Sequence, residues 1–125
     1  MTHFLNGLEQ VFMKRKKTVI IDFDIVGFHY YPDAPDQVAF LENNHRHLFQ
    51  IKVGYDVSFL NREKEIFIQA DFVKEYLTET YGSPCNFKNM SCEMIADEIL
   101  TFAKDDNAIW VEVLEDGKGG AKIEL

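Results

Sequence analysis

Alternation of apolar and polar residues predicts two long β-strands in the first half of the chain. The clearer strand spans 45–60, where an apolar set alternates with a mostly polar one: Phe49, Ile51, Val53, Tyr55, Val57 and Phe59 against Gln50, Lys52, Gly54, Asp56 and Ser58. The other strand spans 18–30, with Val19, Ile21, Phe23 and Ile25 on one face. Successive side chains of a strand point to opposite faces, so a sheet with one buried face is expected.

Helical spacing predicts two helices in the second half, at 69–81 and from Ser91, which would be the N-cap, to about 103. Their buried faces are expected to be Phe72, Val73, Tyr76 and Leu77 in the first, and Met94, Ile95, Ile99, Phe102 and Ala103 in the second. Two more strands follow at 109–114 and 121–125. The order ββααββ predicts an α+β fold, a four-stranded antiparallel sheet with two helices on one face.

Two further segments complete the predicted organisation. Residues 1–17 have apolar positions at helical spacing followed by a basic run, which predicts a short N-terminal helix or arm ahead of a domain at 18–125. Residues 31–44 form a loop with Pro-Asp turn chemistry between the first two strands. Loops of this length in compact domains are often functional.

Composition excludes several classes of partner. The chain has 125 residues, enough for one domain with a core, and a net charge of −8, which argues against a nucleic-acid partner. No apolar run approaches the roughly 20 residues of a membrane span, so no membrane partner is expected. Cys85 and Cys92 form no C-x-x-C motif or disulfide framework, which predicts a cytoplasmic protein with both thiols in core or cap positions.

Three of the four histidines lie where the first predicted strand ends and the second begins. His45 and His47 are two residues apart and so share a face, and His29 has the parity of the buried set. Three imidazoles with an open fourth position commonly hold a catalytic zinc ion, although iron, nickel and copper also accept imidazole. The alternative is that they are core or rim histidines satisfied by hydrogen bonds.

Several motifs carry a resemblance to a known family. Phe28-His29 looks like a zinc histidine that ends a first strand, and His45-Arg46-His47 looks like an H-G-H run that opens a second. Three later stretches, 66–74, 91–96 and 111–116, look like M-V-I-D-F-S-D-L-K, T-S-E-N-I-A and V-x-V-x-E-T. In this order, over 18–125, they resemble the 6-pyruvoyl-tetrahydropterin synthase and 6-carboxytetrahydropterin synthase family, which has the tunnelling fold.

The resemblance implies a zinc-dependent lyase that acts on dihydroneopterin triphosphate, with His29, His45 and His47 as zinc ligands. It maps Glu115 to the glutamate that anchors the pterin ring, since a carboxylate can accept two N–H bonds from a guanidine-like edge. A solvated acid at a strand end is the alternative for Glu115. The resemblance also implies a homo-oligomer with sites at subunit interfaces, in which open sheet edges pair between copies.

Two departures from the family concern its catalytic residues. A catalytic cysteine is expected shortly before the H-x-H run, but residues 39–42 are Ala-Phe-Leu-Glu. A catalytic histidine is expected after the first helix, but residues 81–86 are Tyr-Gly-Ser-Pro-Cys-Asn. No catalytic residue is therefore assigned. Three hypotheses remain: a synthase-type enzyme, a metal-binding relative with lost or altered chemistry that binds a pterin- or purine-like ligand, and a non-catalytic oligomeric module.

Overall fold

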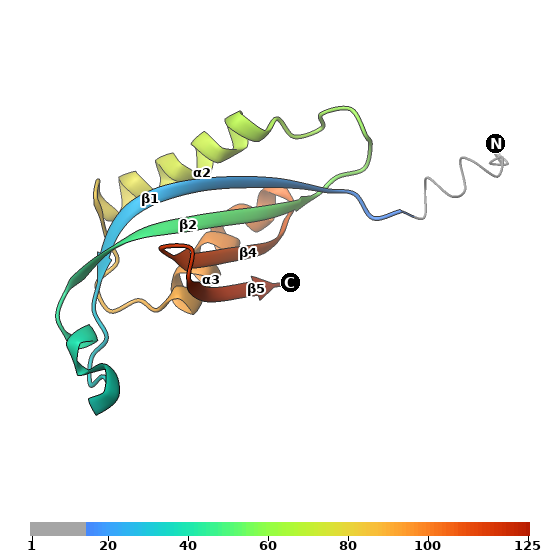
Figure 1. The fold of residues 1–125 in the computed structure, drawn as a ribbon. Helices are drawn as coiled ribbons and strands as arrows, with labels where there is room; N and C mark the ends of the chain where they lie inside the picture. Colours follow the sequence, from blue (N-terminus) through green and yellow to red (C-terminus); the bar gives the residue numbers. More distant parts are fainter. Residues whose placement is uncertain (1–14) are drawn as a thin grey trace, which may run out of the picture.

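The computed structural model describes residues 15–125, so the predicted N-terminal helix or arm lies outside the described residues except for its last three positions. The described part is an α+β domain in which two α-helices pack on a sheet (Figure 1). Its elements are β1 (Thr18–His29), the 3₁₀ helix η1 (Asp36–Glu42), β2 (His45–Asp56), α2 (Ile66–Tyr81), β3 (Cys85–Asn86), α3 (Cys92–Ala103), the 3₁₀ helix η2 (Lys104–Asp106), β4 (Ala108–Glu115) and β5 (Gly119–Glu124).

The sheet has five strands in the order β3-β1-β2-β4-β5, which corrects the predicted four-stranded antiparallel sheet. The four longer strands pair antiparallel as expected, β1 with β2, β2 with β4, and β4 with β5. The additional strand β3 pairs parallel with β1, opposite Gly27 and Phe28. Because β3 has only two residues, it is too short to produce an alternating pattern in the sequence.

Strands β1 and β2 pair in unbroken register, from Thr18 opposite Asp56 to His29 opposite His45. The alternation of inward and outward side chains therefore continues through Gly27 to the end of β1, as predicted. Glycine is required at position 27, since a Cβ atom there would lie 2.7 Å from Cε2 of Phe87. The close approach of Phe87 fills the inner face next to the histidine end of the hairpin.

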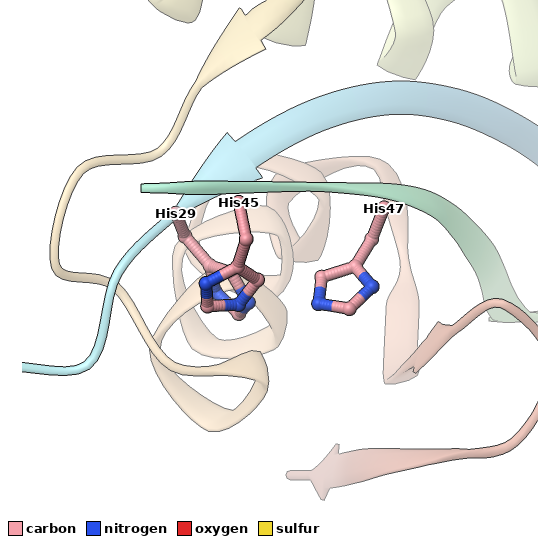
Figure 2. Close-up of side chains that lie close together, drawn as sticks. All are labelled: His29, His45 and His47. Carbon is pink, nitrogen blue, oxygen red and sulfur yellow. The ribbon is translucent and has the colours of Figure 1, made fainter. Parts of the chain in front are cut away.

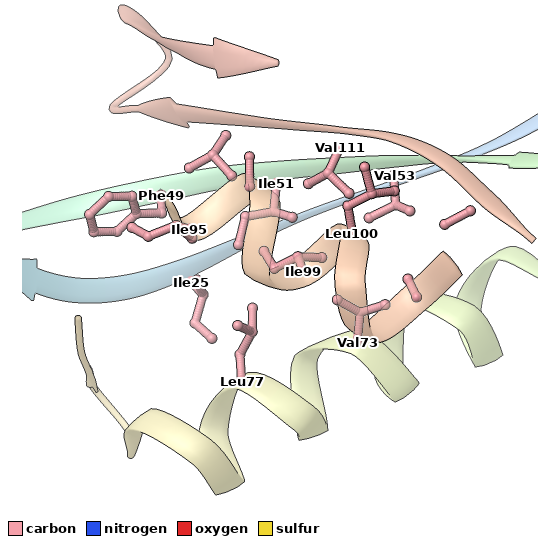
Figure 3. Close-up of a cluster of buried hydrophobic side chains, with 14 of the residues drawn as sticks. Ile25, Phe49, Ile51, Val53, Val73, Leu77, Ile95, Ile99, Leu100 and Val111 are labelled. Atoms are coloured by element: carbon pink, nitrogen blue, oxygen red, sulfur yellow. The ribbon is translucent and has the colours of Figure 1, made fainter. Parts of the chain in front are cut away.

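The core lies between the inner face of the sheet and the two helices (Figure 3). Its largest fully buried side chains are Tyr55, Phe49, Phe87, Ile21, Ile51, Leu77, Ile95, Ile99, Val53, Val73, Val111 and Val113. The opposite face of the sheet is polar at its centre, where Asp22 and Asp24 are exposed as expected. Burial of one apolar face by helices is the principal stabilising interaction of such a two-layer domain.

Three predicted core positions are wrong. Phe72 of α2 is 50% exposed and Met94 of α3 is 54% exposed, because each lies beside the narrower stripe that faces the sheet. The second strand ends at Asp56, so Phe59 belongs to the loop before α2 and is 53% exposed. The predicted N-cap Ser91 is confirmed, and its Oγ accepts a hydrogen bond from the Met94 N–H at 3.2 Å.

Helix α2 begins at Ile66, three residues before the predicted start. Glu65 caps it, and its carboxylate accepts a hydrogen bond from the backbone N–H of Ile68 at 2.8 Å. Among the helices in the described part of the chain, none is long and apolar enough to cross a membrane.

Candidate metal site and adjacent carboxylates

The β1–β2 hairpin brings together the three histidines singled out in the sequence. His29 and His45 are cross-strand neighbours at the end where the 30–44 loop connects the two strands, and His47 lies two residues further along β2. One ring nitrogen from each lies within 4.8 Å of those of the other two, and the rings gather on the inner side of the strands (Figure 2). The cluster could therefore hold a metal ion.

Two of the histidines are oriented by backbone carbonyl groups. His29 Nδ1 lies 2.9 Å from the carbonyl oxygen of Met90, and His45 Nδ1 lies 2.8 Å from that of Asn43. A carbonyl oxygen can only accept, so in both rings Nδ1 carries the hydrogen and donates it. Metal-binding histidines usually donate one ring N–H to such an acceptor and bind the metal through the other nitrogen.

His47 is oriented by a side chain. Its Nδ1 lies 2.6 Å from Oδ2 of Asp116, the residue after β4. Asp116 adopts a left-handed backbone conformation, with φ +53°, and its Oδ1 accepts the backbone N–H of Leu48 at 2.9 Å. These two contacts hold the pKa of the Asp116 carboxyl below its ordinary value. Asp116 was not predicted from the sequence, where it resembles an ordinary turn residue.

The other nitrogen of His47 shows that the residues fit a metal ion. His47 Nε2 is buried and has no hydrogen-bond partner among residues 15–125, which is costly for a polar atom. With Nδ1 protonated, the neutral ring leaves an electron pair on Nε2. Zinc binds neutral imidazole nitrogens of this kind, so the satisfied-histidine alternative does not account for His47.

Glu115, the last residue of β4, lies against the histidine cluster instead of in open solvent. Its Oε1 is 3.0 Å from His29 Nε2. Its Oε2 is 3.5 Å from His47 Nε2, and this second contact is within ion-pair range but does not have hydrogen-bond geometry. The hydrogen bond from His29 lowers the pKa of Glu115 against the opposing effect of burial. Burial lowers the pKa of His29, but Glu115 and the Met90 carbonyl outweigh it and raise that pKa above its ordinary value.

Cys92 also reaches this site, which the sequence did not indicate. It is the first residue of α3, and its thiol donates to Oε1 of Glu115 at 3.4 Å. Burial, followed by the negative charge of Glu115, raises the pKa of Cys92 to about 12. The thiol therefore stays protonated near neutral pH and is a poor nucleophile. Cys85 is buried in β3, so both cysteines occupy the core or cap positions predicted for them.

The fold is similar to that of 6-pyruvoyl tetrahydropterin synthase from Caenorhabditis elegans, with a TM-score of 0.65. The similarity covers 89% of this chain and 96% of that chain, at 12% sequence identity. No protein-family model and no curated protein matches the sequence. The chain thus has a 6-pyruvoyl-tetrahydropterin-synthase-like fold, as the sequence motifs predicted.

Proposed function

We propose that this protein binds a divalent metal ion, zinc in the first place, through His29, His45 and His47, and holds a pterin- or purine-like ring beside it through Glu115. The supporting observation is the state of the three imidazoles. Each has Nδ1 engaged by an oxygen acceptor, which leaves Nε2 for a ligand role in His45 and His47 and, once it is released from Glu115, in His29 as well.

The arrangement of Glu115 supports its proposed role as the ring anchor. Its two oxygens face Nε2 of His29 and of His47, the atoms that would turn toward a metal ion. His29 Nε2 must lose its proton before it can act as a ligand, and Oε1 of Glu115 then keeps only the weak thiol donor of Cys92. The carboxylate is left to accept paired N–H groups from a planar ring.

Zinc bound there would polarise an oxygen atom of the ligand as a Lewis acid. The chain's own groups favour ring binding with lost or altered chemistry over the synthase reaction on dihydroneopterin triphosphate. Residues 39–42 and 81–86 carry neither the expected nucleophilic cysteine before the H-x-H run nor the expected histidine after α2. The thiol that does reach the site, Cys92, is protonated, since its pKa is about 12.

The test separates metal, ring and reaction. Elemental analysis of protein purified without a histidine tag should give one zinc ion per chain. Calorimetry with neopterin and with guanine should then show ring binding that Glu115→Ala abolishes while zinc is retained. Glu112→Ala is the matched control, because Glu112 lies on the same strand but has the opposite parity. Absence of stoichiometric metal, or ring binding that survives Glu115→Ala, would contradict the proposal.

The synthase alternative predicts a different result in the same preparation. Turnover of dihydroneopterin triphosphate at ordinary enzymatic rates, on the order of 1 per second or faster, would establish it and overturn the proposed loss of chemistry. A rate indistinguishable from the uncatalysed one, together with zinc and ring binding, supports a binding protein.

We also propose that the protein is a cytoplasmic homo-oligomer with its sites at subunit interfaces. Strands β3 and β5 are the edges of the sheet, and unpaired edges recruit another strand unless they are protected. Light scattering that gives a monomer at micromolar concentration would contradict this assembly.

A further inference from the structure

His47 differs from the other two histidines in what orients it. The Nδ1 partners of His29 and His45 are backbone carbonyls, whereas that of His47 is the Asp116 carboxylate at 2.6 Å. Asp116 is itself held against β2 from two sides. Its backbone N–H donates to the Leu48 carbonyl at 2.8 Å, and its Oδ1 accepts the Leu48 N–H at 2.9 Å. The carboxylate is thus fixed next to the His47 ring.

We infer that Asp116 is the positioning residue that sets the tautomer and ring orientation of His47, so that Nε2 presents its electron pair to the metal. This inference rests on the proposed metal-binding function. A carboxylate only accepts hydrogen bonds, so it keeps the hydrogen on Nδ1 and leaves Nε2 free of it. The V-x-V-x-E-T motif that residues 111–116 resemble has threonine here, whose hydroxyl both donates and accepts and selects neither tautomer.

Two substitutions separate this role from a merely structural one. In Asp116→Asn, the single amide oxygen is expected to remain on the Leu48 N–H, which turns the NH₂ group toward His47 Nδ1. An NH₂ group can only donate, so it selects the tautomer with hydrogen on Nε2, and an Nε2 atom that carries hydrogen cannot bind a metal. Asp116→Ala removes the carboxylate and leaves the ring free to adopt either tautomer.

The expected order of zinc affinity is therefore wild type, then Asp116→Ala, then Asp116→Asn. A structural role predicts the reverse order for the two variants. Asparagine has nearly the shape of aspartate and tolerates the left-handed φ of +53° better than alanine does. Loss of an outer hydrogen-bond partner typically lowers metal affinity by about 10–100-fold, and Asp116→Asn should lie at or beyond the upper end of that range.

The experiment measures zinc dissociation constants by competition with a chromophoric chelator. Long-range ¹H–¹⁵N spectra of the metal-free proteins report the His47 tautomer directly, with hydrogen on Nδ1 in the wild type and on Nε2 in Asp116→Asn. Asp22→Asn is the matched control. Asp22 lies on the outer face of the sheet, 3.3 Å from the Gln50 amide, and its substitution should leave zinc affinity unchanged.

Each outcome has a definite meaning. Equal affinities, or an alanine variant that binds zinc more weakly than the asparagine variant, would overturn the inference. So would hydrogen on Nε2 of His47 in the metal-free wild type, a measurement that needs no variant to fold. Failure of the wild type to bind zinc would instead overturn the proposed metal-binding function, so the two failures are distinguishable.

Discussion

Phe49 should carry a large share of the stability of this domain without determining its metal affinity. The ring is fully buried and lies between the histidine cluster and the core. Its centroid is 5.2 Å from that of His29, 5.7 Å from that of His47 and 5.1 Å from that of Phe87, with the planes close to perpendicular in each pair. These are favourable edge-to-face arrangements.

The expected loss of stability on substitution of Phe49 follows from its burial and its ring contacts. Phe49→Ala should lower the free energy of unfolding by about 3–5 kcal/mol, because it leaves a cavity under the hairpin. Phe49→Leu refills much of that volume but loses the three ring contacts, and should cost about 1–3 kcal/mol. The histidines are oriented by Met90, Asn43 and Asp116, so the leucine variant should bind zinc nearly as the wild type does.

Urea unfolding of metal-free protein measures the stability, and chelator competition measures zinc binding. Leu48→Ala is the control, since Leu48 directly precedes Phe49 on β2 but is 40% exposed, so its loss should cost less than about 1 kcal/mol. A loss below about 1.5 kcal/mol for Phe49→Ala would refute the described burial. A folded Phe49→Leu variant that no longer binds zinc would show that the ring, and not the hydrogen bonds, positions the histidines.

Four further predictions concern the site and the core. At a free zinc concentration of 100 times the dissociation constant, the free energy of unfolding of the wild type should rise by about 2.7 kcal/mol, which is measured as a higher melting temperature. His45→Gln should show no such rise, while its metal-free melting temperature stays unchanged. Zinc stabilisation that survives in His45→Gln would exclude His45 as a ligand. Burial raises the pKa of Cys85 to about 11 and that of Cys92 to about 12, so iodoacetamide at pH 8 should label neither thiol until urea is added. The pKa of Cys85 in the folded protein lies above its ordinary value of 9.0. The contribution of the protonated Cys85 thiol to stability is therefore complete below pH 9 and is lost as the pH rises toward 11. Unfolding curves at alkaline pH can check this dependence. The buried Tyr55 hydroxyl has no hydrogen-bond partner within residues 15–125, so Tyr55→Phe should leave the stability unchanged or raise it. Tyr76→Phe breaks a 2.9 Å hydrogen bond to Glu98 and should lower the free energy of unfolding by about 1 kcal/mol. Thermal melts of the two variants measure both effects.

The histidine geometry could be predicted from the sequence because it depends on strand parity alone. His45 and His47 share a face in any regular strand, and the unbroken pairing of β1 with β2 places His29 on the same face. The alternation through Phe49 and Ile51 set the register, because a slip by one residue would expose the whole apolar set. The alternating positions from His45 to Val57 were therefore placed correctly, whereas Phe59, at the end of the same pattern, lies beyond the strand.

The groups that orient the imidazoles could not be predicted in the same way. Met90 lies 61 residues from His29 in the sequence, and Asp116 lies 69 residues from His47. Their approach depends on tertiary packing, in which the loop before α3 and the turn after β4 both reach the histidine end of the hairpin. Strand β3 was missed for a similar reason, since a two-residue parallel pairing has no local pattern.

Two consecutive acids bracket one imidazole, and this arrangement favours a divalent cation over an anionic or uncharged occupant. Asp116 Oδ2 lies 2.6 Å from His47 Nδ1, and Glu115 Oε2 lies 3.5 Å from His47 Nε2. With three neutral imidazoles, as metal binding requires, the site carries two negative charges from these carboxylates. A Zn²⁺ ion would balance them, whereas a monovalent ion would balance only one of the two charges. Charge balance and the donor set thus support the proposed divalent metal ion by an argument that does not use the fold.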